Sequence, residues 1–219
     1  MTKPEMYFSI DIETDGLLAS RYNMVSIGAI VAGTYDGEEF LPVSPSLSQT
    51  FFSEIRPVTD LWEEDALRVS APIGMTASMY RQHLLDKAPD ATVVMNEFVA
   101  WIKRCCEDGK FTPIGVARPA AFDWPFIQNY TELYADEGSP FSYSKFLCIN
   151  QLSMDTFGTT LSTSGKRSIG AEFLSKRPHT HNALDDAWEQ GESFALIKAE
   201  NLRRLKLAIR ADALSMLKS

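Results

Sequence analysis

Residues 6–16, Met6-Tyr7-Phe8-Ser9-Ile10-Asp11-Ile12-Glu13-Thr14-Asp15-Gly16, decide the fold that the sequence predicts. Their apolar and aromatic side chains predict a buried strand, and Thr14-Asp15-Gly16 predicts the turn that ends it. Side chains two positions apart point to the same face of a strand, so Asp11 and Glu13 are expected to lie together. Because an unpaired carboxylate in a buried strand is costly, two on one face indicate a bound cation.

The pair Asp11 and Glu13 is a weak signal when it stands alone. With 29 acidic residues in 219, chance gives about one Asp-x-Glu. The same spacing occurs in Asp36-Gly37-Glu38, a hydrophilic hairpin turn in which solvated carboxylates are the simpler interpretation. A structural role for the first pair, such as capping of the following loop, is therefore an alternative at this point.

Strands and helices alternate along the rest of the chain, which predicts an α/β sheet. Apolar runs predict further strands at residues 24–31, 50–55, 111–117 and 146–149. Helical spacing of apolar residues predicts helices at residues 60–70, 89–106, 123–134, 183–198 and 201–217. No internal repeat or low-complexity run interrupts this pattern.

The composition is that of a globular protein. The chain has 219 residues, of which 45% are hydrophobic and 23% are charged, and these values exclude a disordered chain, a coiled coil and a collagen-like repeat. The formal net charge is −8, which disfavours a protein that grips nucleic acid through a broad basic face.

The cysteines and the apolar segments indicate a compartment. Cys105, Cys106 and Cys148 form an odd set with two adjacent members, which favours a reducing environment over a disulfide framework. The N-terminal residues show no signal-peptide pattern, and no apolar run is long enough to span a membrane. We therefore expect a cytoplasmic protein with no membrane partner.

Two further places in the chain combine residue types that carry chemistry. Asp123 follows the predicted strand at 111–117, although an Asp two residues before Pro125 is also ordinary helix-capping chemistry. His181 and Asp186 lie five positions apart at the start of a predicted helix, where both side chains can reach one point. The alternative for this pair is a surface histidine and an acidic residue that the helix dipole favours.

Taken in chain order, these residues resemble the three motifs of the DEDDh superfamily of 3′-5′ exonucleases. Residues 8–16 resemble the first motif, residues 121–126 the second and residues 181–187 the third. The resemblance covers roughly residues 6–200 and points to ribonuclease-T-like and proofreading-exonuclease-like members, in particular to the stand-alone exoribonuclease branch. It implies a ribonuclease H-like fold, a mixed five-stranded sheet flanked by helices.

The resemblance also implies a chemistry. Members of the superfamily hydrolyse nucleic acid from the 3′ end and release nucleoside 5′-monophosphates. By resemblance, Asp11, Glu13, Asp123 and Asp186 would hold two divalent cations, Mg²⁺ or Mn²⁺, which prefer oxygen ligands. Asp11 would bridge the two ions, and His181 would act as the general base, since its ordinary pKa lies near neutrality.

A second set of residues is expected to contact the substrate: Thr14, Leu17, Trp124, Phe126, Lys176 and Arg177. In related enzymes a side chain at the position of Leu17 packs against the terminal base, although a plain packing leucine is equally expected. Aromatic rings could stack on bases, but beside a sheet they are more often part of the core. Basic residues before the third motif could steer phosphates, and a solvated loop is the alternative.

We expect a catalytic domain at residues 1–200 and an amphipathic C-terminal helix at residues 201–219, packed on the domain or at a dimer contact. The expected substrate is the 3′ end of single-stranded RNA or DNA, with RNA favoured. A two-metal phosphodiesterase that acts on short oligonucleotides or nucleotides is an alternative, and a non-catalytic nucleic-acid-binding domain is another. A homodimer is expected by analogy with stand-alone relatives, and Arg118 is either a phosphate contact or a surface residue.

Overall fold

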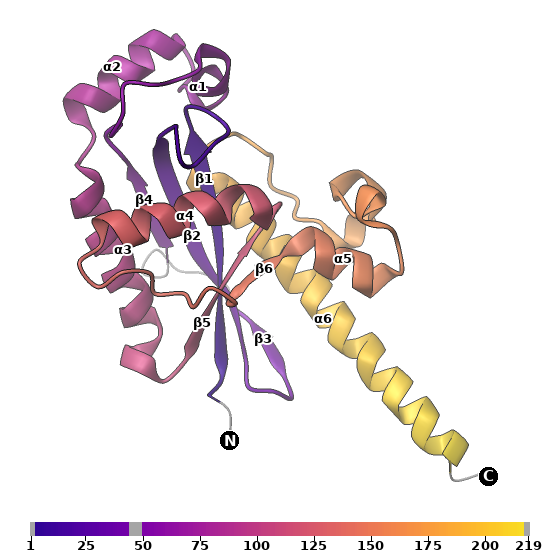
Figure 1. Ribbon diagram of the computed structural model, residues 1–219. Coiled ribbons are helices and arrows are strands. Elements are labelled where there is room, and N and C mark those ends of the chain that lie inside the picture. The colour runs from indigo at the N-terminus through magenta and orange to yellow at the C-terminus, as the bar shows by residue number, and fades with distance from the viewer. Residues whose placement is uncertain (1–2, 44–49, 217–219) are drawn as a thin grey trace.

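The computed structural model describes residues 3–43 and 50–216, which form a mixed sheet with helices on its faces (Figure 1). The strands are β1 (Glu5–Thr14), β2 (Met24–Tyr35), β3 (Phe40–Pro42), β4 (Thr50–Glu54), β5 (Thr112–Ala117) and β6 (Phe146–Cys148). Their order is β3-β2-β1-β5-β6, and β4 also pairs with β2. β1 is antiparallel to β2 and parallel to β5, and β5 is parallel to β6.

The five strands that the sequence predicts are all present, and β3 is a sixth. The predicted turn at Asp36-Gly37 joins β2 to β3, and Asp36 Oδ1 accepts the backbone N–H groups of Glu38 and Glu39 at 2.8 Å each. β3 has only three residues and ends in Pro42, so it carries no recognisable alternation of apolar and polar residues. The α/β prediction is thus confirmed, with one short edge strand added.

The helices are α1 (Glu64–Ser70), α2 (Ala77–Lys87), α3 (Ala91–Cys105), α4 (Ala120–Tyr134), α5 (Ile149–Phe157) and α6 (Ala183–Met216), with short 3-10 turns at Glu107–Gly109, Leu161–Thr163, Lys166–Ser168 and Ala171–Phe173. α1 begins later than predicted because the side chain of Asn23 holds the preceding segment. Its Oδ1 accepts the N–H groups of Val58 and Thr59 at 2.8 Å, and its Nδ2 donates to the carbonyl of Leu61 at 3.1 Å.

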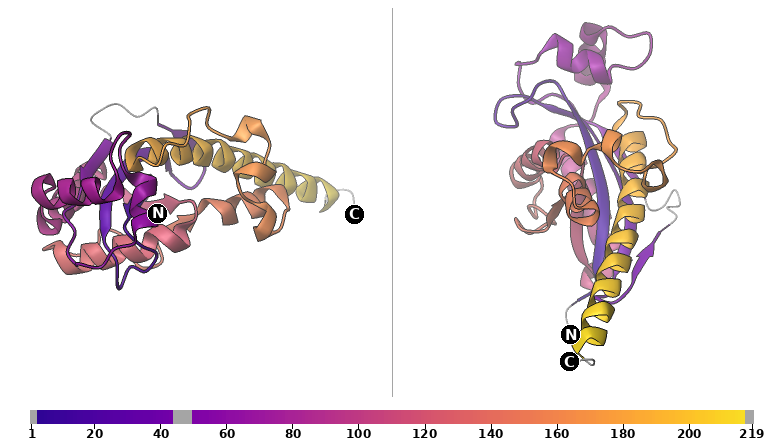
Figure 2. Two further views of the ribbon diagram at one scale, coloured as in Figure 1. Left: turned by 90° about the horizontal axis from the view of Figure 1, so that it is seen from above. Right: turned by 90° about the vertical axis from the view of Figure 1, so that its right-hand side faces the viewer.

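The helices cover the sheet in two layers, with α6 on one face and α3 and α4 on the other (Figures 1 and 2). The main core lies between β1, β2, α3 and α4, and its largest fully buried side chains include Phe8, Phe98, Phe126 and Tyr130. A smaller core joins α6 and α5 to the opposite face around Phe194 and Ile149.

α6 is one continuous helix of 34 residues, whereas the sequence predicts two separate helices. Ala199 and Glu200 lie between the two predicted segments. Both residue types have high helix propensity, so the helix continues through them. The N-terminal half of α6 lies on the sheet, and its C-terminal half extends past the sheet edge (Figure 1). Residues 203–213 are exposed, and residues 217–219 of the predicted C-terminal helix lie outside the described residues.

The described residues also bear on the expected compartment. Cys105, Cys106 and Cys148 are all free thiols. Within residues 3–43 and 50–216, no helix has both the length and the apolar character that crossing a membrane requires.

Candidate active site

Three of the predicted carboxylates meet where β1 ends and α6 begins. Asp11 and Glu13 lie on β1, and Asp186 lies in the first turn of α6. One oxygen from each of the three carboxylates lies within 4.8 Å of the others. Residues 175 positions apart in the chain therefore form one cluster of oxygen donors, of the kind that hard divalent cations bind.

Gly28 allows the start of α6 to lie this close to the sheet. Gly28 on β2 is the register partner of Asp11 on β1. A Cβ atom at position 28 would lie 2.3 Å from the backbone of Ala183 and Leu184, far inside the 3.5–4.0 Å of ordinary carbon contact. The absence of a side chain at Gly28 thus positions Asp186 opposite Asp11.

The carboxylate of Asp186 is fixed by the loop that precedes α6. Asp186 is only 1% exposed, its Oδ1 accepts the N–H of Thr180 and its Oδ2 accepts the N–H of His181, both at 2.9 Å. An acidic side chain in the first turn of a helix also interacts favourably with the helix dipole. These contacts orient Asp186 and place His181 beside it.

Asp123 approaches the cluster from the opposite face of the sheet. α4 begins at Ala120 with Pro119 as its N-cap residue, so Asp123 lies in the first turn and is not the cap. Its buried carboxylate accepts the backbone N–H of Ile12, the residue between Asp11 and Glu13. The capping alternative for Asp123 therefore does not hold, and its carboxylate lies at β1.

The carboxylates destabilise one another's charged forms. Burial, followed by the charges of Asp123, Glu13 and Asp186, raises the pKa of Asp11 well above its usual range. Burial and the charges of Asp186 and Asp123 raise the pKa of Glu13 to about 8, and burial raises the pKa of Asp123 to about 7. The charge of Lys166 offsets part of the shift at Asp11, but among the described residues no Lys or Arg forms an ion pair with these three groups, and a bound cation would stabilise their charged forms.

His181 lies at the edge of the cluster and is exposed. Its backbone has φ 57°, a left-handed conformation that non-glycine residues seldom adopt. Its ring centroid lies 4.5 Å from that of His179, and His179 Nδ1 lies 3.0 Å from Asp186 Oδ1. His179 was not among the predicted site residues, although its position two residues before His181 was a visible signal.

Two residues of α6 also belong to the site and were missed. Gln190 Nε2 donates to Asp11 Oδ1 at 2.5 Å, and the buried carboxylate of Glu189 pairs with Lys166 and lies 3.3 Å from His179 Nδ1. Asp186, Glu189 and Gln190 follow helical spacing, so they share one face of α6. Their spacing of three and four positions from Asp186 on a predicted helix was the sequence signal for them.

The residues predicted to contact substrate differ in how exposed their side chains are. Leu17 is 72% exposed in the loop after β1, whereas Phe126 is 0% exposed and belongs to the core. Thr14 is buried, and its Oγ1 donates to the carbonyl of Gly16 at 2.9 Å. Trp124 is partly buried and stacks on Phe146 at 4.8 Å. The prediction for Phe126 is therefore corrected, because its ring offers no surface to a base.

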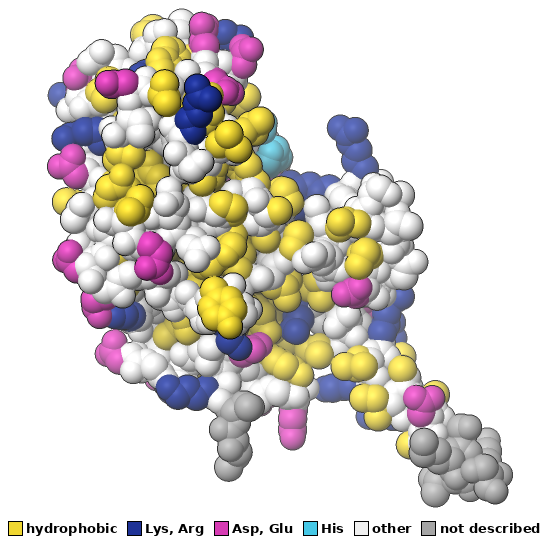
Figure 3. Space-filling view, viewed as in Figure 1, with side chains coloured by type: hydrophobic (Ala, Val, Ile, Leu, Met, Phe, Trp, Pro, Cys, Tyr) yellow, Lys and Arg dark blue, Asp and Glu magenta, His cyan; other side chains and the backbone are white. Residues whose placement is uncertain are grey.

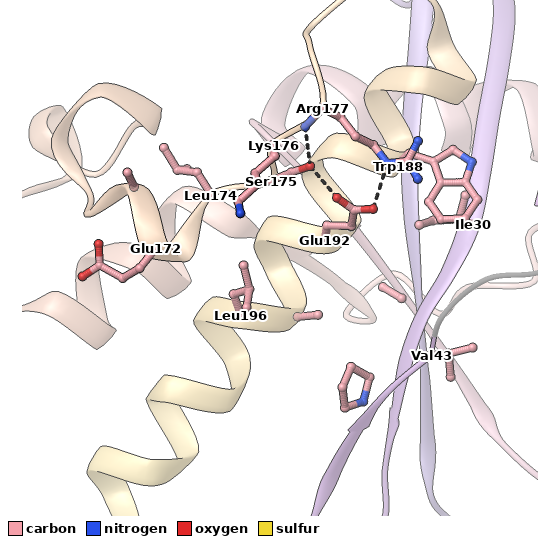
Figure 4. Close-up of a pocket in the computed structure, with 15 residues that line it drawn as sticks. Ile30, Val43, Glu172, Leu174, Ser175, Lys176, Arg177, Trp188, Glu192 and Leu196 are labelled. Carbon is pink, nitrogen blue, oxygen red and sulfur yellow. Dashed lines mark hydrogen bonds and ion pairs between the residues drawn. The ribbon is translucent and has the colours of Figure 1, made fainter.

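Lys176 and Arg177 line a surface pocket of about 710 Å³ between α6, β2, the end of β3 with Val43, and the segment that precedes α6 (Figure 4). Arg177 Nε pairs with Glu192 Oε1 at 2.8 Å, and its guanidinium lies over the ring of Trp188. At 100° per residue, Trp188 and Glu192 are on the face of α6 opposite Asp186 and Gln190. The structure therefore does not bring Lys176 and Arg177 to the carboxylates, and their contact with substrate stays a prediction.

Arg118 is partly buried. Its Nη2 donates to Ser153 Oγ at 3.3 Å, and burial lowers its pKa to about 10. Its Nε and Nη1 atoms are buried without a partner among the described residues. On the face seen in Figure 3, Lys and Arg side chains are scattered and form no continuous basic stripe.

Comparisons with known proteins agree with this geometry. Residues 6–197 match the profile of the 3′-5′ exoribonuclease Rv2179c-like domain. The 3′-5′ DNA exonuclease Cap18 of Escherichia coli is 29% identical over 201 residues, which cover 90% of this chain and 93% of that protein.

Solved structures of low sequence identity share the fold. The nuclease domain of 3′hExo, a DEDDh family member bound to rAMP, superimposes with a TM-score of 0.58 at 13% identity, covering 89% of this chain and 90% of that one. E. coli exonuclease I in complex with a dT13 oligonucleotide gives a TM-score of 0.59 at 14% identity over 93% of this chain, which spans 43% of that protein. The chain belongs to the family of Rv2179c-like 3′-5′ exoribonuclease domains and is a 3′-5′ exonuclease.

Proposed function

We propose that Asp11, Glu13, Asp123 and Asp186 bind two divalent cations, Mg²⁺ or Mn²⁺. The donor set supports this proposal, because it consists of carboxylate oxygens only, and three of them lie within 4.8 Å of one another. Burial raises the pKa values of Asp11, Glu13 and Asp123, and a bound cation would stabilise their charged forms. When bound, the cations would neutralise this charge and stabilise the negative charge that develops on the phosphoryl oxygens.

We propose that one group of the protein accepts a proton during hydrolysis and that others orient the carboxylates. A ring nitrogen of His181 accepts the proton of the attacking water, for which an exposed imidazole next to the cluster is well placed. The N–H groups of Thr180 and His181 hold the Asp186 carboxylate, and Gln190 holds that of Asp11. Cleavage of the terminal phosphodiester releases a nucleoside 5′-monophosphate and leaves a new 3′ hydroxyl.

We propose the 3′ end of single-stranded nucleic acid as the substrate, with RNA preferred. The family description names an exoribonuclease, whereas the relative Cap18 is a DNA exonuclease, so DNA is the alternative. Exposed Leu17, four residues after Glu13 in the loop that follows β1, offers an apolar surface for the terminal base. Two divalent cations would change the formal charge from −8 to −4. Because the protein would still be negatively charged, we expect it to bind the 3′ end at the cations only and to release long strands often, with low processivity.

A digest of 5′-labelled RNA and DNA oligomers tests this function. In Mg²⁺ or Mn²⁺ we expect a ladder that shortens from the 3′ end, with RNA consumed faster than DNA. Asp11→Asn and His181→Ala should abolish the ladder while circular dichroism remains that of the wild type. No cleavage, internal cleavage bands, or full activity in both variants would contradict the proposal.

A phosphodiesterase that prefers very short oligonucleotides is the second candidate, and the acidic charge of the chain favours it. The two functions differ in how the rate depends on substrate length. We expect kcat/KM to rise from dinucleotides to oligomers of about ten residues, because additional phosphates add contacts. A rate that is highest on dinucleotides would favour the second candidate.

We also propose that residues 1–200 form the catalytic domain, from which residues 201–219 extend as an amphipathic helix that joins two copies of the chain. Leu205, Leu207 and Ile209 on this extension are at least half exposed, as expected for a contact that a partner covers. Light scattering should give the mass of a dimer, and Leu205→Glu should give that of the 24.5 kDa monomer. The cytoplasmic location stays a prediction.

A further inference from the structure

Two imidazole rings and one carboxylate meet beside the proposed Mg²⁺ site. His179, His181 and Asp186 each place one ligand atom within 4.8 Å of the others. This set offers two nitrogens and one oxygen, whereas Asp11, Glu13 and Asp186 offer oxygen only. We propose that His179, His181 and Asp186 bind a borderline divalent ion such as Zn²⁺ and that this ion inhibits the nuclease.

The ligand atoms are close to the separation that zinc requires. Zn–N and Zn–O bonds of about 2.0–2.1 Å in a tetrahedral arrangement place neighbouring ligand atoms about 3.3 Å apart. His179 Nδ1 already lies 3.0 Å from Asp186 Oδ1, and the rings of His179 and His181 are 4.5 Å apart at an interplanar angle of 69°. Small rotations of these side chains therefore suffice to complete three protein ligands, with the fourth position open to water.

The surroundings of the three ligands also suit a metal ion. Asp186 is held by two backbone N–H groups, so the carboxylate is oriented before an ion arrives. Glu189 Oε2 lies 3.3 Å from His179 Nδ1, and a carboxylate beside a ligating histidine commonly supports metal binding. The side chain of His179 is 48% exposed, and His181 is exposed as well, so an ion from solvent has access.

Asp186 belongs to both sets of ligands, so an ion bound by the histidine set competes with the carboxylate set for this side chain. Imidazole nitrogens favour Zn²⁺ strongly over Mg²⁺, whereas an all-carboxylate set suits Mg²⁺ and Mn²⁺. A zinc ion on His179, His181 and Asp186 would engage Asp186 and occupy the ring nitrogen of His181 that is proposed to accept the proton of the attacking water. The inhibition rests on the proposed function, but the binding of zinc does not.

Metal binding is therefore measured first, and without a nuclease assay. Metal-free protein is titrated with Zn²⁺ by calorimetry and with Co²⁺ by visible absorption, which reports nitrogen ligation. The variants are His179→Ala and His181→Ala, with His83→Ala as the matched control, because His83 pairs with Glu54 and is not one of the three ligands. Asp11→Asn identifies binding at the carboxylate site, and circular dichroism checks the fold of each variant.

We expect one site whose affinity for Zn²⁺ falls at least about 10-fold in His179→Ala and His181→Ala and is unchanged in His83→Ala. Micromolar Zn²⁺ should also slow the wild-type nuclease in millimolar Mg²⁺, and His179→Ala should be less sensitive relative to its own activity in Mg²⁺. The inference is overturned if Zn²⁺ affinity survives in His179→Ala, or if it is lost in Asp11→Asn but kept in both histidine variants. A protein that binds zinc as expected but cleaves no oligomer would contradict the proposed function alone.

Discussion

The substitution Gly28→Ala tests how the sheet and α6 build the site. The added Cβ would lie 2.3 Å from the carbonyl group of Ala183 and the nitrogen of Leu184. Restoring contact distances of at least about 3.5 Å requires the start of α6 to move by on the order of 1 Å. Asp186 and His181 would move with the helix, away from Asp11 on β1.

A displacement of about 1 Å at a catalytic constellation can lower the rate about 100-fold, and overpacking costs roughly 1–3 kcal/mol of stability. We therefore expect kcat/KM on a labelled oligomer to fall by about 100-fold in Gly28→Ala, with a lower melting temperature and a folded far-UV spectrum. Gly165→Ala is the control, because a Cβ there meets nothing within 4 Å. Activity within about threefold of wild type in Gly28→Ala would refute the argument that this close approach sets the geometry.

Three further predictions concern the charge, orientation and substrate contact of the site. Burial and neighbouring acids raise the pKa of Glu13 to about 8 and of Asp123 to about 7, so both groups favour folding in their neutral form. Their stabilising contribution is complete below their unfolded pKa values of about 4 and is lost as pH rises through about 7 to 8. Thermal melts in a chelator should therefore give a lower melting temperature at about pH 8 than at about pH 5. Added Mg²⁺ should raise the melting temperature more at pH 8 than at pH 5. A melting temperature that does not change with pH would contradict this prediction. Gln190→Ala should lower kcat about 10-fold by freeing Asp11, with little change in KM, and kinetics equal to wild type would exclude that positioning role. Leu17→Ala should raise KM several-fold at constant kcat, since it removes apolar contact with the terminal base. Steady-state kinetics on oligomers measure both constants, and a fall in kcat with unchanged KM would contradict this role.

Much of the fold could be predicted because local patterns and tertiary structure agree. The first motif combines strand periodicity with paired acids, and β1 with Asp11 and Glu13 follows that pattern. α2 was missed because it buries only Ala77, Tyr80 and Leu84 and is otherwise polar, so the apolar spacing that predicts a helix is weak. α5 was missed because it begins directly after β6, without the turn that would mark its start.

The candidate site was predictable only as far as its motifs extend. Asp123, His181 and Asp186 could be chosen because they recur in a fixed order, and their roles stay predictions until tested. Nearness along the chain did not place Lys176 and Arg177 at the carboxylates, because both residues line a pocket on another face of α6. Which face of a helix a loop reaches is decided by packing, and the local sequence does not encode it.

The central claim is that four carboxylates from β1, α4 and α6 bind the cations used for 3′-5′ cleavage. Anomalous diffraction from crystals soaked in Mn²⁺ and a nucleoside 5′-monophosphate tests this claim most directly, since it locates the ions without assuming activity. We predict two manganese peaks in contact with Asp11, Glu13, Asp123 and Asp186, with the phosphate of the nucleotide beside them. Manganese absent from these carboxylates, or a phosphate bound in the pocket of Lys176 and Arg177, would contradict the account.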